Sequence, residues 1–256
     1  MDITHPDTYW EQKLPNDWEE IVNWSKDGCV RWTTNKELYS ILCKGFLIND
    51  NEELFFLANN GMKCHMLSAR KAFRNTSCHW KPLPDSRFGV VACDPVEMFY
   101  MNCKSITLSP RTTYGAYLVY KLQENHPRFK SPLEVRLKHN YGGVESIKYY
   151  IYLLSRDQPL DISGKVYQKK RVPKRRNDGW MEVPIWEFET SFTVTGPIWK
   201  FEGIMNPARQ NTTVEFLFTA LDNTSLKGLI VEDIEFRPFR KCPDRNQLCY
   251  EEITFC

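Results

Sequence analysis

Tryptophan and glutamate side chains gather in one short segment of this chain and have the chemistry of a sugar-binding surface. Trp180, Glu182 and Trp186 are separated by two and four residues, and Trp80 lies earlier in the chain. Indole rings stack on the apolar C–H side of a sugar, and carboxylates hydrogen bond to its hydroxyl groups. This combination predicts a surface that binds carbohydrate.

The same segment has the alternation of a β-strand, in which successive side chains point to opposite faces. One predicted face carries Trp180, Glu182, Pro184 and Trp186, and the other carries Met181, Val183 and Ile185. The aliphatic face should contact the core. The tryptophan face is then either a ligand surface or is covered by a loop, since tryptophans on strands are more often buried than free for a ligand.

Short strands separated by turn residues dominate the middle and the end of the chain. Aromatic residues make up 14% of the 256 residues, a composition that suits pleated sheets. The clearest predicted strand lies within 108–122. Its one face carries Tyr114, Ala116, Leu118, Tyr120 and Leu122, and its other face carries Tyr117 and Val119. Further strands are expected at 62–67, 133–138, 147–154, 180–185, 213–218 and 228–236. Because no long helical pattern intervenes, we predict an all-β fold, an antiparallel jelly-roll-like β-sandwich.

The N-terminal region has a different pattern. Residues 1–35 predict a short helical segment with Asn16 as a cap, and a second helix is expected from Lys36 to Cys43, ended by Gly45. Strands at 46–48 and 54–57 follow. Residues 1–35 are too few to fold alone.

Several motifs between Lys36 and Pro238 are characteristic when taken together. They are Lys36-Glu37-Leu38-Tyr39, Met66-Leu67-Ser68-Ala69-Arg70, Trp80-Lys81, Pro84-Asp85-Ser86-Arg87-Phe88, the run from Leu108 to Leu122, Arg176-Asn177-Asp178-Gly179-Trp180-Met181-Glu182, Glu187-Phe188 and Gly228 to Pro238. As a set they resemble the plant phloem lectin family, also called the phloem protein two or Nictaba-like family. The resemblance implies a lectin β-sandwich over 61–238, a helical lead-in with first strands over 1–60, and a cysteine-containing tail over 239–256.

Residues 9–18 look like the junction that follows an F-box in one branch of this family. The chain before Lys36 is too short for an F-box, so we expect none in this sequence and no binding to a ubiquitin-ligase adaptor.

The resemblance also implies the residues of the sugar site. Trp80, Trp180, Glu182 and Glu187 match the family positions that bind glycans containing N-acetylglucosamine. The loop before Trp80 is shorter than in the family and lacks a first tryptophan. Met98 and Leu226 stand where relatives usually have tryptophan, so we expect weakened or redirected sugar binding.

Charge and targeting signals give weaker predictions. The net charge is +2, so the whole molecule has no strong electrostatic attraction to nucleic acid. A local basic run could direct nuclear import; it contains Lys169, Lys170, Arg171, Lys174, Arg175 and Arg176. A solvated loop is the alternative. Without a secretory signal or a membrane-spanning stretch, the expected location is the cytoplasm, the nucleus or both.

Metal binding and catalysis are not predicted. The nine cysteines include Cys64 and Cys78, each followed by histidine, and three in the tail, but no Cys-x-x-Cys pair. We expect reduced thiols, no metal and no cofactor. Signatures of hydrolases and phosphate-binding loops are missing, which predicts that the protein is not an enzyme. A glycoside hydrolase is the enzyme class to keep in view, since it needs only a pair of carboxylates across a cleft.

These patterns lead to one preferred function and one alternative. The preferred function is lectin-like binding of N-acetylglucosamine oligomers or N-glycans, with glycans or glycoproteins as partners and homo-oligomers as an open possibility. The alternative is a protein-interaction module that keeps the sandwich and has lost sugar binding.

Overall fold

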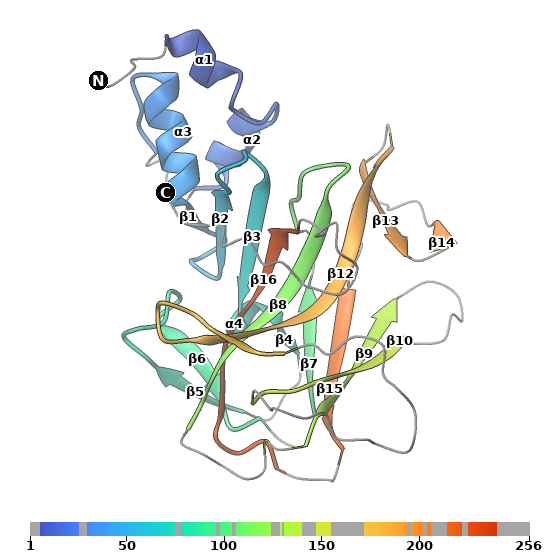
Figure 1. The fold of residues 1–256 in the computed structure, drawn as a ribbon. Helices are drawn as coiled ribbons and strands as arrows, with labels where there is room; N and C mark the ends of the chain where they lie inside the picture. Colours follow the sequence, from blue (N-terminus) through green and yellow to red (C-terminus); the bar gives the residue numbers. More distant parts are fainter. Residues whose placement is uncertain are drawn as a thin grey trace.

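The chain forms a β-sandwich with three helices at one end (Figure 1). The structure is a computed structural model that describes residues 6–25, 30–74, 78–95, 98–103, 106–123, 129, 131–139, 147–154, 172–193, 196–201, 204–205, 214–221 and 225–239. All strand pairs in this part of the chain are antiparallel. The predicted antiparallel sandwich with a short helical N-terminal segment is therefore confirmed.

The larger sheet, which we call sheet A, has the strand order β1-β2-β3-β16-β8-β12-β13-β14. In that order the strands are Phe46–Ile48, Glu53–Leu57, Lys63–Ser68, Leu229–Pro238, Thr113–Leu122, Met181–Thr193, Gly196–Phe201 and Ile204–Met205. Three more strands attach to it, namely β5 (His79–Pro82), β6 (Val90–Cys93) and β11 (Lys174–Arg175). β6 joins β16, β5 joins β6, and β11 joins β12.

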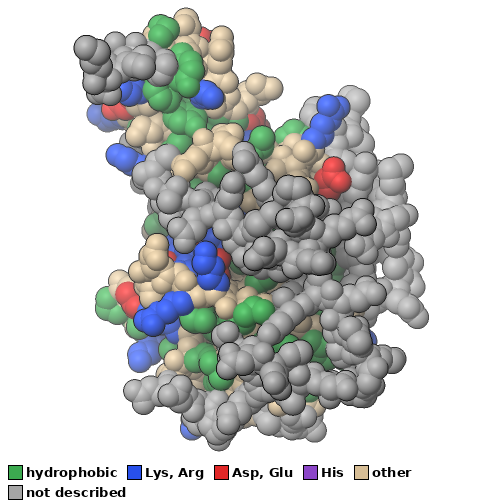
Figure 2. Space-filling view, viewed as in Figure 1, with side chains coloured by type: hydrophobic (Ala, Val, Ile, Leu, Met, Phe, Trp, Pro, Cys, Tyr) green, Lys and Arg blue, Asp and Glu red, His purple; other side chains and the backbone are tan. Residues whose placement is uncertain are grey.

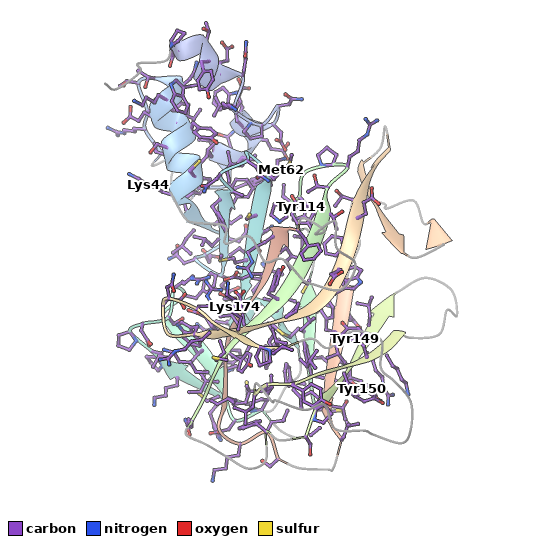
Figure 3. All side chains as sticks on the ribbon, in the orientation of Figure 1. Lys44, Met62, Tyr114, Tyr149, Tyr150 and Lys174 are labelled. Carbon is purple, nitrogen blue, oxygen red and sulfur yellow. The ribbon has the colours of Figure 1, made fainter. Side chains whose placement is uncertain are left out.

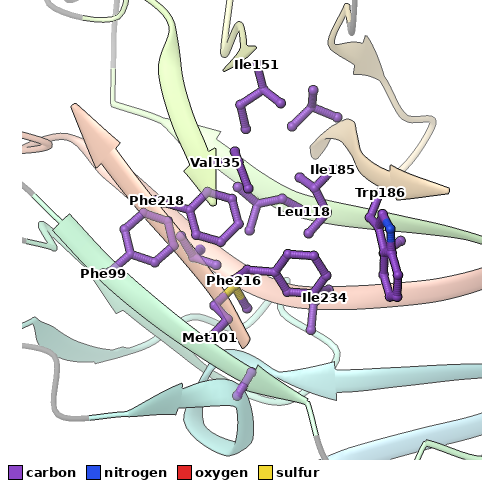
Figure 4. Close-up of a cluster of buried hydrophobic side chains, with 14 of the residues drawn as sticks. Phe99, Met101, Leu118, Val135, Ile151, Ile185, Trp186, Phe216, Phe218 and Ile234 are labelled. Carbon is purple, nitrogen blue, oxygen red and sulfur yellow. The ribbon is translucent and has the colours of Figure 1, made fainter. Parts of the chain in front are cut away.

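The smaller sheet, sheet B, has the order β10-β9-β15-β7-β4. Its strands are Ile147–Ile151, Leu133–His139, Val214–Ala220, Met98–Cys103 and Phe73–Arg74. The inner faces of the two sheets enclose the main core, where Leu118, Ile185 and Ile234 of sheet A meet Phe99 and Phe216 of sheet B (Figure 4). The opposite side of sheet A is its outer face, and the candidate site lies there.

The helices pack on the end of sheet A that contains β1 and β2. They are α1 (Asp7–Glu11), α2 (Trp18–Asn23) and α3 (Asn35–Lys44), and a further short helix, α4 (Ala69–Ala72), follows β3. In α3 the Thr34 side chain accepts a hydrogen bond from the Glu37 N–H, and Gly45, at φ 78°, ends the helix. A second core containing Ile21, Leu38 and Phe55 joins these helices to the sheet. The predicted helix at 36–43 is confirmed, and no described helix is long and apolar enough to cross a membrane.

Two β-bulges decide which side chains face the core. In β12 the register with β8 shifts between Pro184 and Trp186, so Ile185 is an extra residue. The alternation changes phase there, and both Ile185 and Trp186 lie in the main core. The predicted outward position of Trp186 is therefore wrong. Pro184 has no N–H to give to the ladder, which favours an irregularity beside it.

In β16 the register with β8 shifts between Val231 and Asp233, which makes Glu232 the extra residue. The bulge lies where β16 changes its neighbour from β6 to β3. Val231 and Ile234 both face the main core, whereas Glu232 and Asp233 lie outside it. One extra residue thus puts two adjacent carboxyl groups on the outer face.

Candidate functional site

The four candidate sugar-binding residues lie in two separate places. Trp180, Glu182 and Glu187 follow one another along the outer face of sheet A, with Glu182 opposite Val119 and Glu187 opposite Gly115. Trp80 on β5 stands opposite Ala92, whose side chain is part of the main core. Residues directly opposite on paired strands share a face, so Trp80 is on the other side of the sheet. The structure brings three candidates together and separates the fourth.

Trp80 is open to solvent. The residue is 41% exposed, and its ring contacts the Phe73 ring edge-on at a centroid distance of 6.1 Å. Phe73 in turn stacks on Phe99 at 5.2 Å. The indole therefore rests on the core at one edge and remains accessible to a ligand.

Trp180 is buried, with only 1% exposed. The Nζ of Lys121 lies 4.3 Å from the ring centroid, the indole N–H donates to the Asp85 carbonyl at 3.4 Å, and Lys121 also pairs with the Asp85 carboxylate. Val119 and Ile230 belong to the same apolar cluster. The expectation of an open Trp180 ring is wrong; a loop covers it, the other arrangement that the alternation allowed.

Eight charged residues form what we call the outer-face ionic cluster. They are Arg87, Arg176, Arg237, Asp178, Glu182, Glu232, Asp233 and Glu235. Glu182 accepts from Arg237 at 2.9 Å and from Arg176 at 3.4 Å. Because this carboxylate is buried and bound by two guanidinium groups, it stabilises the outer face of sheet A and is not free to bind a sugar.

Glu235 is at the centre of this cluster. It accepts from Arg176 at 2.6 Å and from Arg87, and an Arg237 nitrogen lies 3.4 Å away. Burial by itself would raise the pKa of Glu235, but the guanidiniums of Arg237, Arg87 and Arg176 lower it to about 2. Glu235 is therefore a buried anion on the outer face of sheet A.

Arg87 fastens two loops to the outer face. Its backbone N–H donates to Glu232 at 2.7 Å, and its guanidinium donates to Asp178 at 2.9 Å and to Glu235. Arg87 thus ties the loop at 83–89 both to β16 and to the segment at 176–180, which has a second bond to β16 from Arg176. Charge-assisted bonds of this kind are stronger than neutral ones.

An aromatic ring fills the space beside these charges. The Arg237 guanidinium carbon lies 4.0 Å from the centroid of Tyr117, which is buried. A Cβ at Gly115 would come within 2.6 Å of the Tyr117 hydroxyl oxygen, so only glycine fits beneath this ring. Glu187 is half-buried and stands opposite Gly115 on the paired strands.

The sequence reasoning did not single out Arg87, Arg237, Asp233 or Glu235. A signal for them was present in the alternation of β16, where Asp233, Glu235 and Arg237 share the face opposite Ile234 and Phe236. Three charged residues on one side of a central strand must find partners when that side is covered.

Comparison with known proteins gives the family. A sequence model of phloem protein 2 matches residues 62–238. This chain belongs to the phloem protein 2 family. Among its relatives in Arabidopsis thaliana, F-box protein At2g02240 is 31% identical over 246 residues, covering 91% of this chain and 68% of the relative. F-box protein SKIP3 is 31% identical over 248 residues, with 91% and 76% covered, and F-box protein VBF is 28% identical over 260 residues, with 91% and 86% covered.

Among solved structures, the Cry4Aa toxin of Bacillus thuringiensis aligns with 74% of this chain and 30% of its own, at 12% identity and a TM-score of 0.38. We draw no argument about the phloem protein 2 domain from a likeness of that size.

The basic run of this phloem protein 2 chain is described only in part. Lys174 and Arg175 are exposed on β11, and basic side chains gather on this side of the sandwich (Figures 2 and 3). Arg176 is committed to Asp178, Glu182 and Glu235. Lys169, Lys170 and Arg171 lie outside the described residues, as do the three tail cysteines. Nuclear targeting through this run stays a prediction, and Arg176 is not free to take part in it.

No metal-binding arrangement is present among the described residues. They contain no group of three or more histidine, cysteine, aspartate and glutamate side chains that could hold a metal ion. Cys64 and Cys103 are buried, and burial raises the pKa of both thiols.

Shortening Lys121 is expected to expose the Trp180 ring. Lys121→Ala removes the aliphatic stem and the ammonium group that cover the indole, interactions worth about 1 kcal/mol in total. We expect stronger acrylamide quenching of the Trp180 contribution to fluorescence, obtained by subtracting the signal of the matching Trp180→Phe protein because the chain has seven other tryptophans. Lys121→Met is the matched control, because it keeps the stem and should leave quenching nearly unchanged. Equal quenching in Lys121→Ala and the parent would show that the lysine does not cover the ring.

Proposed function

We propose that this phloem protein 2 chain is a carbohydrate-binding, lectin-like module that recognises N-acetylglucosamine oligomers or N-glycans with Trp80 as its stacking surface. The observation that carries the proposal is the exposure of the Trp80 indole, which is supported from below by Phe73 and Phe99. A rigid, exposed ring offers a flat apolar surface at a small cost in side-chain entropy. The family membership, which the resemblance to phloem lectins implied, supports the same function.

The proposed affinity for one site is modest. A single aromatic stacking contact contributes about 0.5 to 1.5 kcal/mol beyond the area it buries. Hydrogen bonds to sugar hydroxyls compete with water, so binding in the micromolar to millimolar range follows, and several sites acting together would raise it.

The other candidates take different roles in this proposal. Trp180 and Glu182 hold the outer face of sheet A together, as their burial and their partners Lys121, Arg176 and Arg237 indicate. Glu187 is half-buried and remains a candidate carboxylate for a ligand on the outer face.

Substitution of Trp80 tests the proposal. Purified protein is screened on a glycan array, and binding of chitotriose is then measured by calorimetry. Trp80→Ala should weaken binding at least about tenfold through loss of stacking and buried area, while Trp80→Phe should keep part of it. Lys81→Ala is the control, because Lys81 is also exposed on β5 but follows Trp80 and so points to the opposite face of the strand. Unchanged affinity in Trp80→Ala would remove this site.

A protein-interaction module is the second candidate. It is favoured by the commitment of Trp180 and Glu182 to internal contacts, which leaves fewer groups for a sugar. The relatives At2g02240 and SKIP3 are named F-box proteins, and this name suggests that they recognise other proteins. Silence on the glycan array, together with a protein ligand whose binding depends on Trp80, would favour this second function.

A further inference from the structure

The outer-face ionic cluster contains more acids than bases. Its described members provide five carboxyl groups and three guanidinium groups. Glu232, Asp233 and Glu235 are each 0% exposed. Burying unpaired negative charge is costly, because neither water nor a counter-ion can reach it. Some of these carboxyl groups must therefore be compensated in another way.

Asp233 is the carboxyl group with the least compensation. Neither of its oxygens takes part in a hydrogen bond within the described chain, and its nearest cation is the Arg87 Nη1 at 3.5 Å. That nitrogen is already used, since it donates to Glu235 and lies 3.0 Å from the Met66 sulfur. Glu232, by contrast, accepts the backbone N–H of Arg87.

The titratable and charged groups around Asp233 come from several elements. β16 itself provides Glu232, Glu235 and Arg237, and β12 provides Glu182. The loop at 83–89 provides Arg87 and Asp85, the segment at 176–180 provides Arg176 and Asp178, and β8 provides Tyr117 and Lys121. β3 provides Cys64 and, directly opposite, the neutral Ser68; β6 provides Cys93; α4 provides Arg70 and Lys71. Lys71 and Lys121 are paired elsewhere, with Glu53 and Asp85.

We propose that Asp233 carries a bound proton in the folded protein, and that this proton keeps the loop at 83–89 fastened over the outer face of sheet A. Ionised Asp233 would repel Glu232 and Glu235 in the interior and compete with Glu235 for the Nη1 of Arg87. Since Arg87 ties the loop at 83–89 to β16, its displacement loosens that loop, whereas the segment at 176–180 keeps its own bond from Arg176 to Glu235.

The electrostatic surroundings support the proposal. Burial raises the pKa of Asp233 well above its usual value, and the Glu235 carboxylate raises it further, against the opposing effect of Arg87. A group with a raised pKa in the folded state binds its proton more tightly there than in the unfolded chain. Its favourable contribution to folding is complete at low pH and is lost as the pH rises from the unfolded aspartate value through the folded one.

The loss of this proton also has a consequence for the covered indole. Asp85, which accepts the Trp180 N–H and pairs with Lys121, lies in the loop that Arg87 fastens. Loosening of the loop would uncover Trp180 at higher pH. This inference concerns the ionic cluster and holds whether or not the protein binds sugar.

Asp233→Asn tests the proposal, because asparagine has nearly the shape of a protonated aspartate. Urea unfolding of parent and variant is compared in steps between about pH 5 and pH 9. The ratio of their unfolding equilibrium constants should change with pH, with the parent losing stability relative to the variant by up to about tenfold per pH unit for one proton. Amide exchange in the loop at 83–89, corrected for its intrinsic pH dependence, should rise in the parent alone.

Two further measurements keep the test decisive. Glu232→Gln removes one charge that raises the pKa of Asp233, so the pH dependence of the parent should move to lower pH and persist. If the substitution abolishes that dependence instead, the proton sits on Glu232 and the assignment to Asp233 is wrong. Carbon-13 NMR of the aspartate carboxyl groups requires no substitution, so it serves even if Asp233→Asn does not fold. One aspartate should remain protonated at pH values where exposed aspartates are ionised. Stability curves that run parallel at all pH values, or a spectrum in which every aspartate ionises together, would overturn the proposal.

Discussion

Trp180→Ala is expected to destabilise the folded protein by about 3 to 5 kcal/mol, the range found when a buried large aromatic side chain is truncated. Trp180 is 1% exposed and packs in the apolar cluster with Val91, Val119 and Ile230. Alanine would leave a cavity against the strands and release the Asp85 carbonyl and the Lys121 ammonium from their partner. The measurement is the free energy of unfolding from urea denaturation.

The matched control is Trp80→Ala, the same substitution at an exposed indole. It is expected to change the free energy of unfolding by about 1 kcal/mol or less, because little buried surface is lost. Comparing the two variants distinguishes a binding defect caused by unfolding from one caused by loss of a ligand contact. Weaker binding in Trp180→Ala is explained by instability, whereas weaker binding in stable Trp80→Ala is a direct effect. A fully stable Trp180→Ala protein would contradict the burial of this ring.

Glu235→Gln is expected to lower the free energy of unfolding by about 3 kcal/mol at neutral pH. The substitution keeps the size of the side chain but removes the anion that Arg87, Arg176 and Arg237 share. Removing one partner of a buried ionic group costs about 3 to 5 kcal/mol in other proteins, and here the three arginines lose the carboxylate that all of them contact.

The effect of Glu235→Gln should depend on pH in a defined direction. The three arginines outweigh burial and lower the pKa of Glu235 from 4.5 to about 2 in the folded protein. Its stabilising contribution is therefore complete above the unfolded value and is lost as the pH falls from about 4.5 to about 2. The stability difference between parent and variant should shrink over that range, the reverse of the trend expected for Asp233→Asn.

Unfolding curves at several pH values between neutral and acid conditions measure this trend. Glu11→Gln, at an exposed position on α1, is the control, and should stay within about 0.5 kcal/mol of the parent. A Glu235→Gln protein as stable as the parent at neutral pH would show that the three arginines do not depend on this carboxylate.

The N-terminal helix and the central strands were predictable because their signals are local. Thr34 caps α3 and Gly45 ends it, so the predicted helix at 36–43 differs from the observed one by a single residue at each end. In β8 the side chains of Tyr114, Ala116, Leu118 and Tyr120 share the core face, as the alternation indicated. The strands at 79–82, 90–93 and 98–103 were missed, because they are short or their apolar and polar residues do not alternate.

Composition, local alternation and motifs were enough to assign the all-β class and the family, and to single out the residues from Asp178 to Glu182. Which of those side chains meet solvent depends on contacts between distant segments. A single-residue bulge at Ile185 reverses the faces of the residues from Trp186 to Thr190. The charged positions change with it, from Glu182 before the bulge to Glu187 and Glu189 after it, so the regular alternation extended from Trp180 predicts the wrong face for Trp186. The cover over Trp180 comes from Asp85 and Lys121, and one of the two arginines that hold Glu182 is Arg237, all of them distant in sequence. Long-range contacts of this kind depend on how strands pair, and strand pairing is set by the packing of the whole sandwich.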